Sequence, residues 1–415
     1  MSSINGTTFT GRPSGTSDFA GHANAANGGA IYNYIGNLRV VNNAQFYDFK
    51  ASQDGGVIYD NNSGSYTTDI DTVNLQNVTI DGHHGGMQDG EYNAQRGGAI
   101  FTATQGEMRK GGSTRLSNCQ ILDCAVSSQG GAIFNQSARR EVSTNDNVDE
   151  PTIHLVNTVI DGHETRPETT NNAQRGGAIL ISNGTLVMEK TGTGTSEIRD
   201  CKTTTDGGGI TSYGGGTQFK NQSREFGVND YTVKLKNTTI ESCSSQNGGG
   251  ISIKQILVLL NATIKDYAAT DNGGAIYLFG DGNLHDVRMN DSTYNQNVIS
   301  GNTAGVHGGG IYLPEPSKLS IAGIPDFGGT DATGGNRIGT GANEKREDIF
   351  IAGYLGLNGD DPKLADSLIV TGKLYESLTS VDDVKGQIWV GAQQQDIFGC
   401  YLPTLCGSLR PTRTP

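Results

Sequence analysis

Aromatic residues are scarce in this chain of 415 residues: they make up 7% of it, with a single Trp, and the apolar fraction is 34%. Such a composition argues against a thick core covered by helices. No apolar stretch reaches the length of about 18 residues that a transmembrane helix needs, which excludes direct membrane insertion by a helix. The six Cys are too few for a disulfide scaffold.

Basic residues are outnumbered, with 30 Lys and Arg against 43 Asp and Glu, a net charge of −13. Nucleic acids and anionic lipids need a basic surface, so we expect neither as a partner. The first residues, Met1 to Gly6, lack the charged and apolar regions of a signal peptide. We therefore expect either a fragment of a longer secreted protein or export without such a signal.

Glycine is abundant, with 61 residues, roughly twice the usual share. Much of it belongs to a motif of two Gly, a small residue and Ile, repeated at intervals of 25 to 46 residues. Repeats of this period indicate a solenoid, a propeller or an array. The nine copies begin at Gly28, Gly55, Gly97, Gly130, Gly176, Gly207, Gly248, Gly273 and Gly308.

A second motif precedes the glycine pairs, as in Asn77-Val-Thr-Ile80 and Asn157-Thr-Val-Ile160, and alternating residues such as Val73 and Leu75 come before it. This period of two indicates half-buried strands, and no helical period is present in the repeats. A unit of about 25 residues is too short for a propeller blade and cannot bury its own apolar face, so units must stack. The sequence predicts an all-β parallel β-helix of roughly 11 coils with inserted loops and a C-terminal cap.

Three regions are predicted: a repeat region over 1–315, irregular terminal coils and a cap over 316–392, and a tail or linker over 393–415. The segment Asn93–Ile100 recurs as Asn172–Ile179, 79 residues later. Long inserts should therefore alternate with short connections, and we expect them to leave on one side of the rod. Further strands are expected at 318–321, 348–352, 367–370 and 387–390.

The Gly-Gly-Ala-Ile repeats resemble those of chlamydial polymorphic outer-membrane proteins and of adhesin-like surface proteins of gut bacteria and methanogenic archaea. The resemblance covers about residues 5–315. It implies a right-handed parallel β-helix that is secreted and exposed on a cell surface. The family's second motif, Phe-x-x-Asn, survives only loosely: Ile299-Ser-Gly-Asn302 keeps the Asn, and Phe46-Tyr-Asp-Phe49 keeps the Phe.

Equivalent positions of a β-helix stack in columns, and the Ile that ends each Gly-Gly motif should point inward. The Gly pair before it suits a corner where φ is positive or the backbone is crowded. The predicted inward column is Ile31, Ile58, Ile100, Ile133, Ile179, Ile210, Ile251, Ile276 and Ile311.

An Asn column precedes the second-motif Ile, with Thr195 replacing Asn in one coil. Stacked amides can hydrogen-bond along the rod, and we favour this ladder over glycosylation, although three members lie in Asn-x-Thr sequons. The loop sequons at Asn135, Asn183 and Asn221 are better candidates for glycosylation. The predicted structural ladder is Asn43, Asn77, Asn118, Asn157, Asn237 and Asn261.

Aromatic residues recur directly after the inward Ile and should face the opposite side of the strand. An exposed aromatic stripe would bind a glycan or a partner protein. The alternative is that the inserted loops cover it. The candidate binding column is Tyr32, Tyr59, Phe101, Phe134, Tyr277 and Tyr312.

Two further columns carry titratable groups. The residues after the second-motif Ile alternate in charge from Asp161 onward, which favours charge balance over paired catalytic acids. The column two positions later mixes His and Cys, but parallel ligands cannot converge on zinc, so we predict a filler column and neither metal nor cofactor. The two columns are Asp81, Leu122, Asp161, Arg199, Glu241, Lys265, and Phe49, His83, Cys124, His163, Cys201, Cys243, Tyr267, Asn302.

The disulfide assignments stay open. Cys201 and Cys243 occupy adjacent coils, where a bridge is sterically conceivable but not expected. Cys400 and Cys406 flank a short segment and are a candidate disulfide, with two free thiols as the alternative.

Known polysaccharide-cleaving β-helices carry motifs that this chain lacks. Gly82-His83-His84 lacks the final Gly of the polygalacturonase pattern, and no clustered base accompanies the acids. We therefore expect a non-catalytic extracellular β-helix, adhesin-like or part of a surface assembly, with a glycan or protein partner on a cell or particle surface. The alternatives are a polysaccharide lyase or glycoside hydrolase, and a viral tailspike or receptor-binding protein on a virion surface.

Overall fold

In the residues it describes, the computed structural model contains 43 short strands and no α-helix. The described residues are 2–11, 25–34, 36–61, 72–84, 91–103, 113–136, 152–163, 171–182, 184–213, 231–279, 285–289, 293–294, 296–314, 317–322, 326–328, 335–341, 344–351, 367–371, 388–390 and 393–395.

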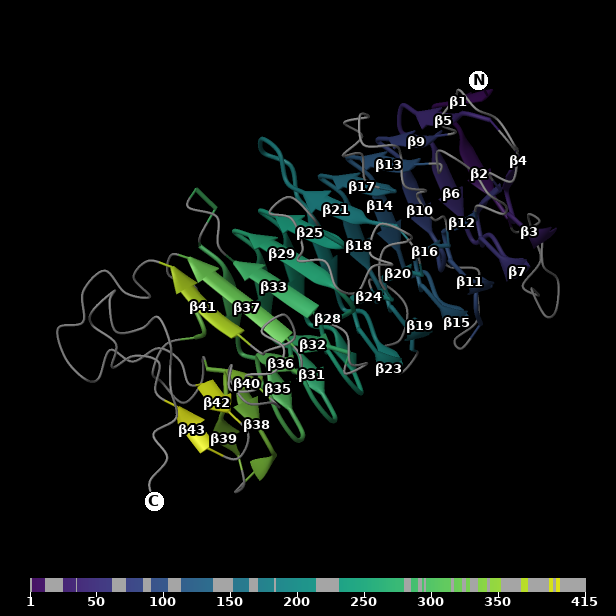
Figure 1. Ribbon diagram of the computed structural model, residues 1–415. Coiled ribbons are helices and arrows are strands. Elements are labelled where there is room, and N and C mark those ends of the chain that lie inside the picture. The colour runs from purple at the N-terminus through teal and green to yellow at the C-terminus, as the bar shows by residue number, and fades with distance from the viewer. Residues whose placement is uncertain are drawn as a thin grey trace, which may run out of the picture.

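The strands stack into sheets that run along a rod, with the N-terminal coil at one end and the last coils at the other (Figure 1). A complete coil passes through one strand each of sheet A, sheet B, sheet C or its continuation sheet E, and sheet D. Sheet A consists of β1 (Ser2–Asn5), β5 (Leu38–Val41), β9 (Thr72–Gln76), β13 (Ser113–Ser117), β17 (Ile153–Val156), β21 (Leu186–Glu189), β25 (Val233–Lys236), β29 (Ile256–Leu260), β33 (His285–Met289), β37 (Ser317–Ala322) and β41 (Ser367–Thr371). Sheet B consists of β2 (Thr8–Thr10), β6 (Gln45–Tyr47), β10 (Thr79–Asp81), β14 (Gln120–Leu122), β18 (Val159–Asp161), β22 (Glu197–Arg199), β26 (Thr239–Glu241), β30 (Thr263–Lys265) and β34 (Val298–Ser300).

The remaining sheets close each coil. Single bridges from Lys202 to Ser244 and from Asp206 to Asn247 join sheet C to sheet E along the rod. Sheet C consists of β3 (Ala25–Asn27), β7 (Ala51–Asp54), β11 (Ala94–Arg96), β15 (Val126–Gln129), β19 (Ala173–Arg175) and β23 (Thr203–Asp206), and sheet E of β27 (Ser244–Ser245), β31 (Ala268–Ala269), β35 (Thr303–Ala304), β38 (Arg337–Ile338) and β39 (Lys345–Arg346). Sheet D consists of β4 (Ile31–Tyr34), β8 (Ile58–Asn61), β12 (Ile100–Ala103), β16 (Ile133–Asn135), β20 (Ile179–Ile181), β24 (Ile210–Ser212), β28 (Ile251–Ile253), β32 (Ile276–Leu278), β36 (Ile311–Leu313), β40 (Ile349–Ile351), β42 (Ile388–Val390) and β43 (Gln393–Gln395).

This arrangement is a right-handed parallel β-helix, which confirms the predicted fold class. The eleven strands of sheet A agree with the predicted number of coils. Because parallel neighbours lie about 4.8 Å apart, these strands span roughly 48 Å of the rod axis.

The core is built from apolar residues that lie in register from coil to coil. In sheet D, Ile58 pairs with Ile100 and Ile100 pairs with Ile133, and the column continues to Ile311 and Ile349. From Ile58 to Ile311 every Ile of the predicted column is fully buried, and Ile31 in the first coil is partly buried. Burial of one such side chain stabilises the fold by about 1.5–3 kcal/mol, so the column is a major part of the stability.

The corner between sheets C and D explains why the glycines come in pairs. The first Gly of each pair has φ between 59° and 66°, which L side chains rarely adopt. The second Gly lies against the next coil: a Cβ on Gly131 would lie 1.9 Å from the carbonyl oxygen of Gly177. The equivalent distances in the other coils down to Gly274 are 2.0 to 2.3 Å. The first Gly therefore permits the turn, and the second permits the coils to approach.

Two buried Asn close the inserts between sheets B and C. Asn93 donates to the carbonyls of Phe49 and Gly82 at 3.1 and 2.9 Å, and its Oδ1 accepts from the backbone N–H of Ala125 at 2.9 Å. Asn172 makes the equivalent three bonds two coils later, to Cys124, Gly162 and Lys202. Each amide joins three successive coils, which is why this Asn begins both copies of the repeated segment.

The predicted column containing His83 and His163 is wrong at these two positions. The insert begins at each of them, and the chain returns to the core only at Asn93 and Asn172. The Cβ atoms of Asn93, Cys124, Asn172 and Cys201 occupy equivalent places beneath successive glycine corners. The inward column therefore reads Phe49, Asn93, Cys124, Asn172, Cys201, Cys243, Tyr267 and Asn302, all buried.

The longest inserts leave the rod at two corners rather than on one side, and shorter ones follow β21 and β33 of sheet A. One group follows sheet B, after β2, β10 and β18, and alternates with the short connections after β6, β14 and β22, as the repeat predicts. The other group follows sheet D, after β8, β12, β16 and β24. The corner between sheets C and D cannot hold an insert, because there the second Gly of each pair must lie directly against the backbone of the next coil.

Beyond residue 316 the expected strands are present as β37, β40, β41 and β42. Sheets A and D continue through them in parallel, and antiparallel pairs β38–β39 and β42–β43 end sheets E and D. β43 stands at the start of the predicted tail, and the boundaries of the three predicted regions stay predictions. Residues 396–415 lie outside the described residues.

Replacing Gly131 by Ala tests the glycine contact. The added methyl group clashes with backbone and forces two coils apart, so we expect the free energy of unfolding to fall by about 3 kcal/mol. Gly192→Ala is the control, because Gly192 has φ of 58° but nothing within 4 Å of its Cβ position. That change should cost only about 1 kcal/mol. Chemical denaturation measures both, and equal losses would show that the close approach is unimportant.

Candidate binding groove

The turn between sheets A and B places a row of Asn side chains on the outside of the rod. Each Asn of the predicted ladder has φ between 49° and 61°, in the left-handed region that Asn tolerates better than other residues with a side chain. The shared backbone conformation is thus one reason for the column. Hydrogen bonds along it are present in two places, Asn157 to Asn118 and Asn261 to Asn237, both at 3.2 Å.

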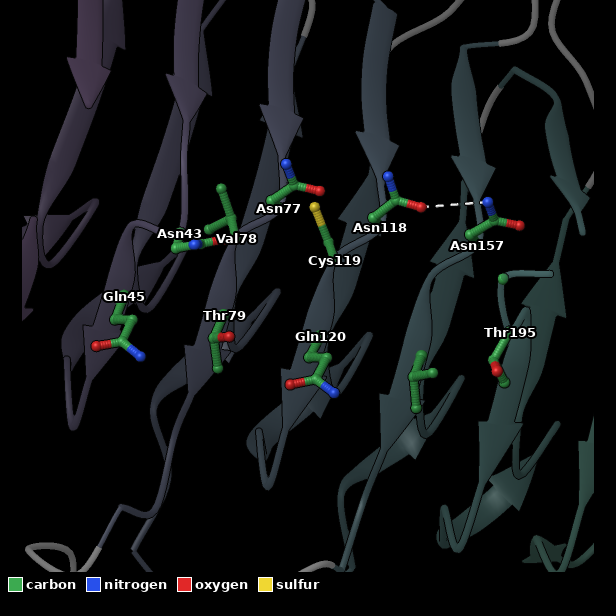
Figure 2. A pocket seen from close by; sticks show the side chains of 12 residues that line it. Asn43, Gln45, Asn77, Val78, Thr79, Asn118, Cys119, Gln120, Asn157 and Thr195 are labelled. Carbon is green, nitrogen blue, oxygen red and sulfur yellow. Dashed lines mark hydrogen bonds between the residues drawn. The ribbon is translucent and has the colours of Figure 1, made fainter. Parts of the chain in front are cut away.

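A shallow groove of about 610 Å³ follows this turn across successive coils. Figure 2 shows the amides of Asn77, Asn118 and Asn157 side by side, with Gln45, Thr79 and Gln120 in a second row from sheet B. The lining residues are Asn43, Gln45, Asn77, Val78, Thr79, Asn118, Cys119, Gln120, Asn157, Val159, Gly194 and Thr195.

Some side chains of the groove are hydrogen-bonded to other parts of the protein, and others are not. Asn157 is occupied, because it donates to Asn118 and to the Thr191 hydroxyl and accepts from the Thr191 backbone N–H. Gln45 accepts from the Thr8 hydroxyl at 2.8 Å. Within the described part of the chain, the side chains of Asn43, Asn77, Thr79 and Gln120 make no hydrogen bond to protein. These groups remain available to a ligand.

The groove contains no ordinary catalytic acid or base. Cys119 is its one titratable residue, and it is 2% exposed and donates to the carbonyls of Ser117 and Leu75. Burial raises the pKa of this thiol to about 11. Because a thiol with so high a pKa stays protonated, Cys119 is not a nucleophile at neutral pH.

Acidic groups lie on sheet B beside the groove but serve local structure. The Asp81 carboxylate accepts from the backbone N–H of His83 and contacts His84 Nδ1, both at 2.9 Å, in an Asx turn that starts the insert. Burial, and then the charge of Asp81, raise the pKa of Asp48. Asp161 accepts from the backbone of His163 in the same way.

The alternating charges of sheet B form ion pairs between coils, as predicted. Asp161 contacts Arg199 Nε at 2.6 Å, and Glu241 contacts Lys265 Nζ at 2.8 Å. The hydrogen bond from Lys265 lowers the pKa of Glu241. The column therefore balances charge and offers no free acid–base pair.

The candidate aromatic column lies on the outer face of sheet D. Tyr59, Phe101 and Phe134 stack with centroids 5.1 Å apart, and Tyr277 stacks on Tyr312 at 5.3 Å. Tyr32 is 51% exposed, but Tyr59, Phe101 and Phe134 are at most 7% exposed. The column is thus an internal stack over part of its length, which argues against a continuous aromatic binding stripe.

Part of this aromatic stack is covered by a column of polar side chains that was not predicted from the sequence. The Arg96 guanidinium lies 4.8 Å from the centre of the Phe101 ring and pairs with both oxygens of Asp54 at 2.6 and 2.7 Å. Two coils later, Arg175 Nε lies 3.2 Å from the Asp206 carboxylate and forms an ion pair with it. The sequence does contain a sign of this column, because the position before each Gly pair is always polar or charged. These residues are Asn27, Asp54, Arg96, Gln129, Arg175, Asp206, Asn247, Asn272 and His307.

Asn135 is a poor glycosylation candidate in the folded chain. It is 1% exposed, accepts from Thr102 Oγ1 at 2.5 Å and donates to Thr152 Oγ1 at 3.3 Å. The other sequon candidates, Asn183 and Asn221, lie outside the described residues, as do Cys400 and Cys406.

The described cysteines, Cys119, Cys124, Cys201 and Cys243, are free and buried. Cys201 and Cys243 are therefore not bridged, and their mutual hydrogen bond and burial raise the pKa of Cys201. Across the described ranges, no group of three His, Cys, Asp or Glu is arranged to hold a metal ion. No helix in that part of the chain is long and apolar enough to cross a membrane.

Comparisons of the chain with protein-family models, with curated proteins and with solved structures gave no match.

The raised pKa of Cys119 leads to a labelling prediction. At pH 8 only about one thiol in a thousand is ionised, so iodoacetamide should leave Cys119 unmodified in the native protein and modify it after denaturation. Peptide mass spectrometry measures the modification. Rapid labelling of native Cys119 would show a reactive thiol in the groove. It would contradict the conclusion that Cys119 is not a nucleophile.

Proposed function

We propose that this protein is a non-catalytic, extracellular β-helix, adhesin-like in its role, that binds a glycan on a cell or particle surface. The observation that carries the proposal is the groove on sheets A and B, whose lining offers amides and hydroxyls but no carboxylate, imidazole or amine. Such groups can hold a polyhydroxylated ligand, but they do not supply general acid–base catalysis.

The rod architecture supports this role. Stacked repeats give an extended surface on which several coils can contact one ligand. The groove crosses five coils, from Gln45 to Thr195, and Figure 2 shows its lining side chains following one another from coil to coil. The resemblance of the Gly-Gly-Ala-Ile repeats to those of surface adhesins supports a location on the cell surface.

A polysaccharide-cleaving enzyme is the second candidate, because the pKa of Asp48 is raised beside Asp81. A carboxyl group of raised pKa beside a second carboxyl group is a usual arrangement in glycosidases. However, Asp48 is 4% exposed and Asp81 is 6% exposed and held in its turn. These acids do not present an open site, so binding without cleavage is the better-supported function.

Binding and cleavage can be separated by one experiment on the full chain. The protein is incubated with neutral polysaccharides (β-glucan, mannan, arabinoxylan) and acidic ones (polygalacturonate, alginate, hyaluronate). Affinity electrophoresis measures binding, and reducing ends and unsaturated products measure cleavage. We expect binding to at least one polysaccharide and no product.

Two results would contradict the proposal. Turnover that disappears in Asp48→Asn or Asp81→Asn would establish the enzyme instead. If the protein binds none of these polysaccharides, the proposal that it binds a glycan is wrong.

A further inference from the structure

We infer that the groove and the neighbouring Tyr47–His84 ring pair form one site for a neutral, extended polysaccharide that lies along the rod axis. The inference rests on the proposed function and specifies its ligand class and the residues that recognise it. It is carried by the spacing of the amides, their unused hydrogen bonds, the charge of the lining and the position of the rings.

The groove amides repeat at the spacing of the coils. Asn77, Asn118 and Asn157 are contributed by successive coils, which repeat about every 4.8 Å, and Figure 2 shows their amides pointing in similar directions. A linear polysaccharide presents similar hydroxyl groups at a regular interval that is close to the length of one sugar ring. A row of identical donors and acceptors suits such a repeating ligand.

The Asn side chains of this chain are of two kinds, those bonded between coils and those left open in the groove. Asn93 and Asn172 are buried and use both side-chain ends to hold the coils together. In the groove, the side chains of Asn77 and Gln120 are bonded to no other part of the protein among the described residues. A side-chain amide has two donors and an acceptor, which can meet neighbouring hydroxyls of one sugar.

The lining of the groove is uncharged. No Lys, Arg, Asp or Glu lines the groove, although charged residues continue along sheet B beyond it. There Arg199 is paired with Asp161 and Lys265 with Glu241. An acidic polysaccharide would find no cation in the groove to pair with its carboxylates, which favours a neutral chain.

An aromatic surface lies on sheet B beside the amides. Gln45 and Thr79 pair in register, and two residues further along the same outer face Tyr47 pairs with Asp81. The Tyr47 and His84 rings stack at 3.9 Å with an interplanar angle of 10°. The His84 side chain is 53% exposed. Ring faces of this kind stack on the apolar face of a sugar, which an array of amides alone cannot contact.

The test removes two groove amides without changing the turn. In Asn77→Gly with Asn118→Gly, glycine keeps the left-handed conformation and deletes only the side chain. We expect affinity for the neutral polysaccharide bound in the panel to fall about tenfold or more, in line with the loss of two or three hydrogen bonds. The midpoint of unfolding, measured in parallel, confirms that the variant is folded.

The matched control is Asn237→Gly. Asn237 has φ of 52°, belongs to the same column and accepts from Asn261 as Asn118 accepts from Asn157, but it does not line the groove. Its replacement should change affinity less than about twofold. A second pair of variants, Gln120→Ala and Thr263→Ala, compares a groove position with an outer position of sheet B beyond the groove. The His84→Ala variant tests whether the stacked ring contributes to the affinity.

The outcomes separate this inference from the proposed function. Neutral binding that falls in the Asn77/Asn118, Gln120 and His84 variants but not in the controls supports it. Binding that is unchanged in the groove variants, or confined to acidic polysaccharides, overturns the inference while the glycan-binding function stands. No binding by the native chain overturns both.

Discussion

The structure depends on the contact between the second glycine of each Gly-Gly pair and the carbonyl of the next coil. A Cβ at Gly56 or Gly131 would lie within 2.0 Å of that oxygen, so no other residue allows the coils this close approach. At this distance backbone hydrogen bonds such as Gly131 N–H to Gly176 C=O, at 2.9 Å, join successive coils. The corner therefore fixes both the spacing and the register of all the sheets.

A fixed register places like positions above each other, and each column must tolerate its own repetition. Ile on Ile buries apolar surface, and Arg199 between Asp161 and Glu241 prevents like charges from stacking. The Asn turn between sheets A and B is tolerated because its amides face solvent. The same constraint that stacks the coils therefore lines up a row of polar groups, of which those of Asn43, Asn77, Thr79 and Gln120 are not used by the fold, and this row is the proposed binding site.

The sequence predicted the features that repeat in every coil: the inward Ile column, the glycine corner and the parallel fold. It failed where the chain departs from the repeat. His83 and His163 match the motif by position, but the inserts begin there and Asn93 and Asn172 enter the core instead. The Asn column was predicted, but its unused amides and the groove depend on how side chains of several strands meet, which no single repeat reveals. For the aromatic column the sequence left open an exposed stripe or a covered one. Three of its six residues, Tyr59, Phe101 and Phe134, are buried, and the Arg96 side chain over Phe101 comes from sheet C, on the other side of the glycine corner.

A crystal structure of the protein with a neutral oligosaccharide of the type it binds would test the central claim most directly. The ligand is expected to lie along the rod axis across β6, β10 and β14, with its hydroxyls bonded to Asn77, Asn118 and Gln120. A ligand bound instead to the aromatic face of sheet D, or at an insert with the groove left to solvent, would contradict it.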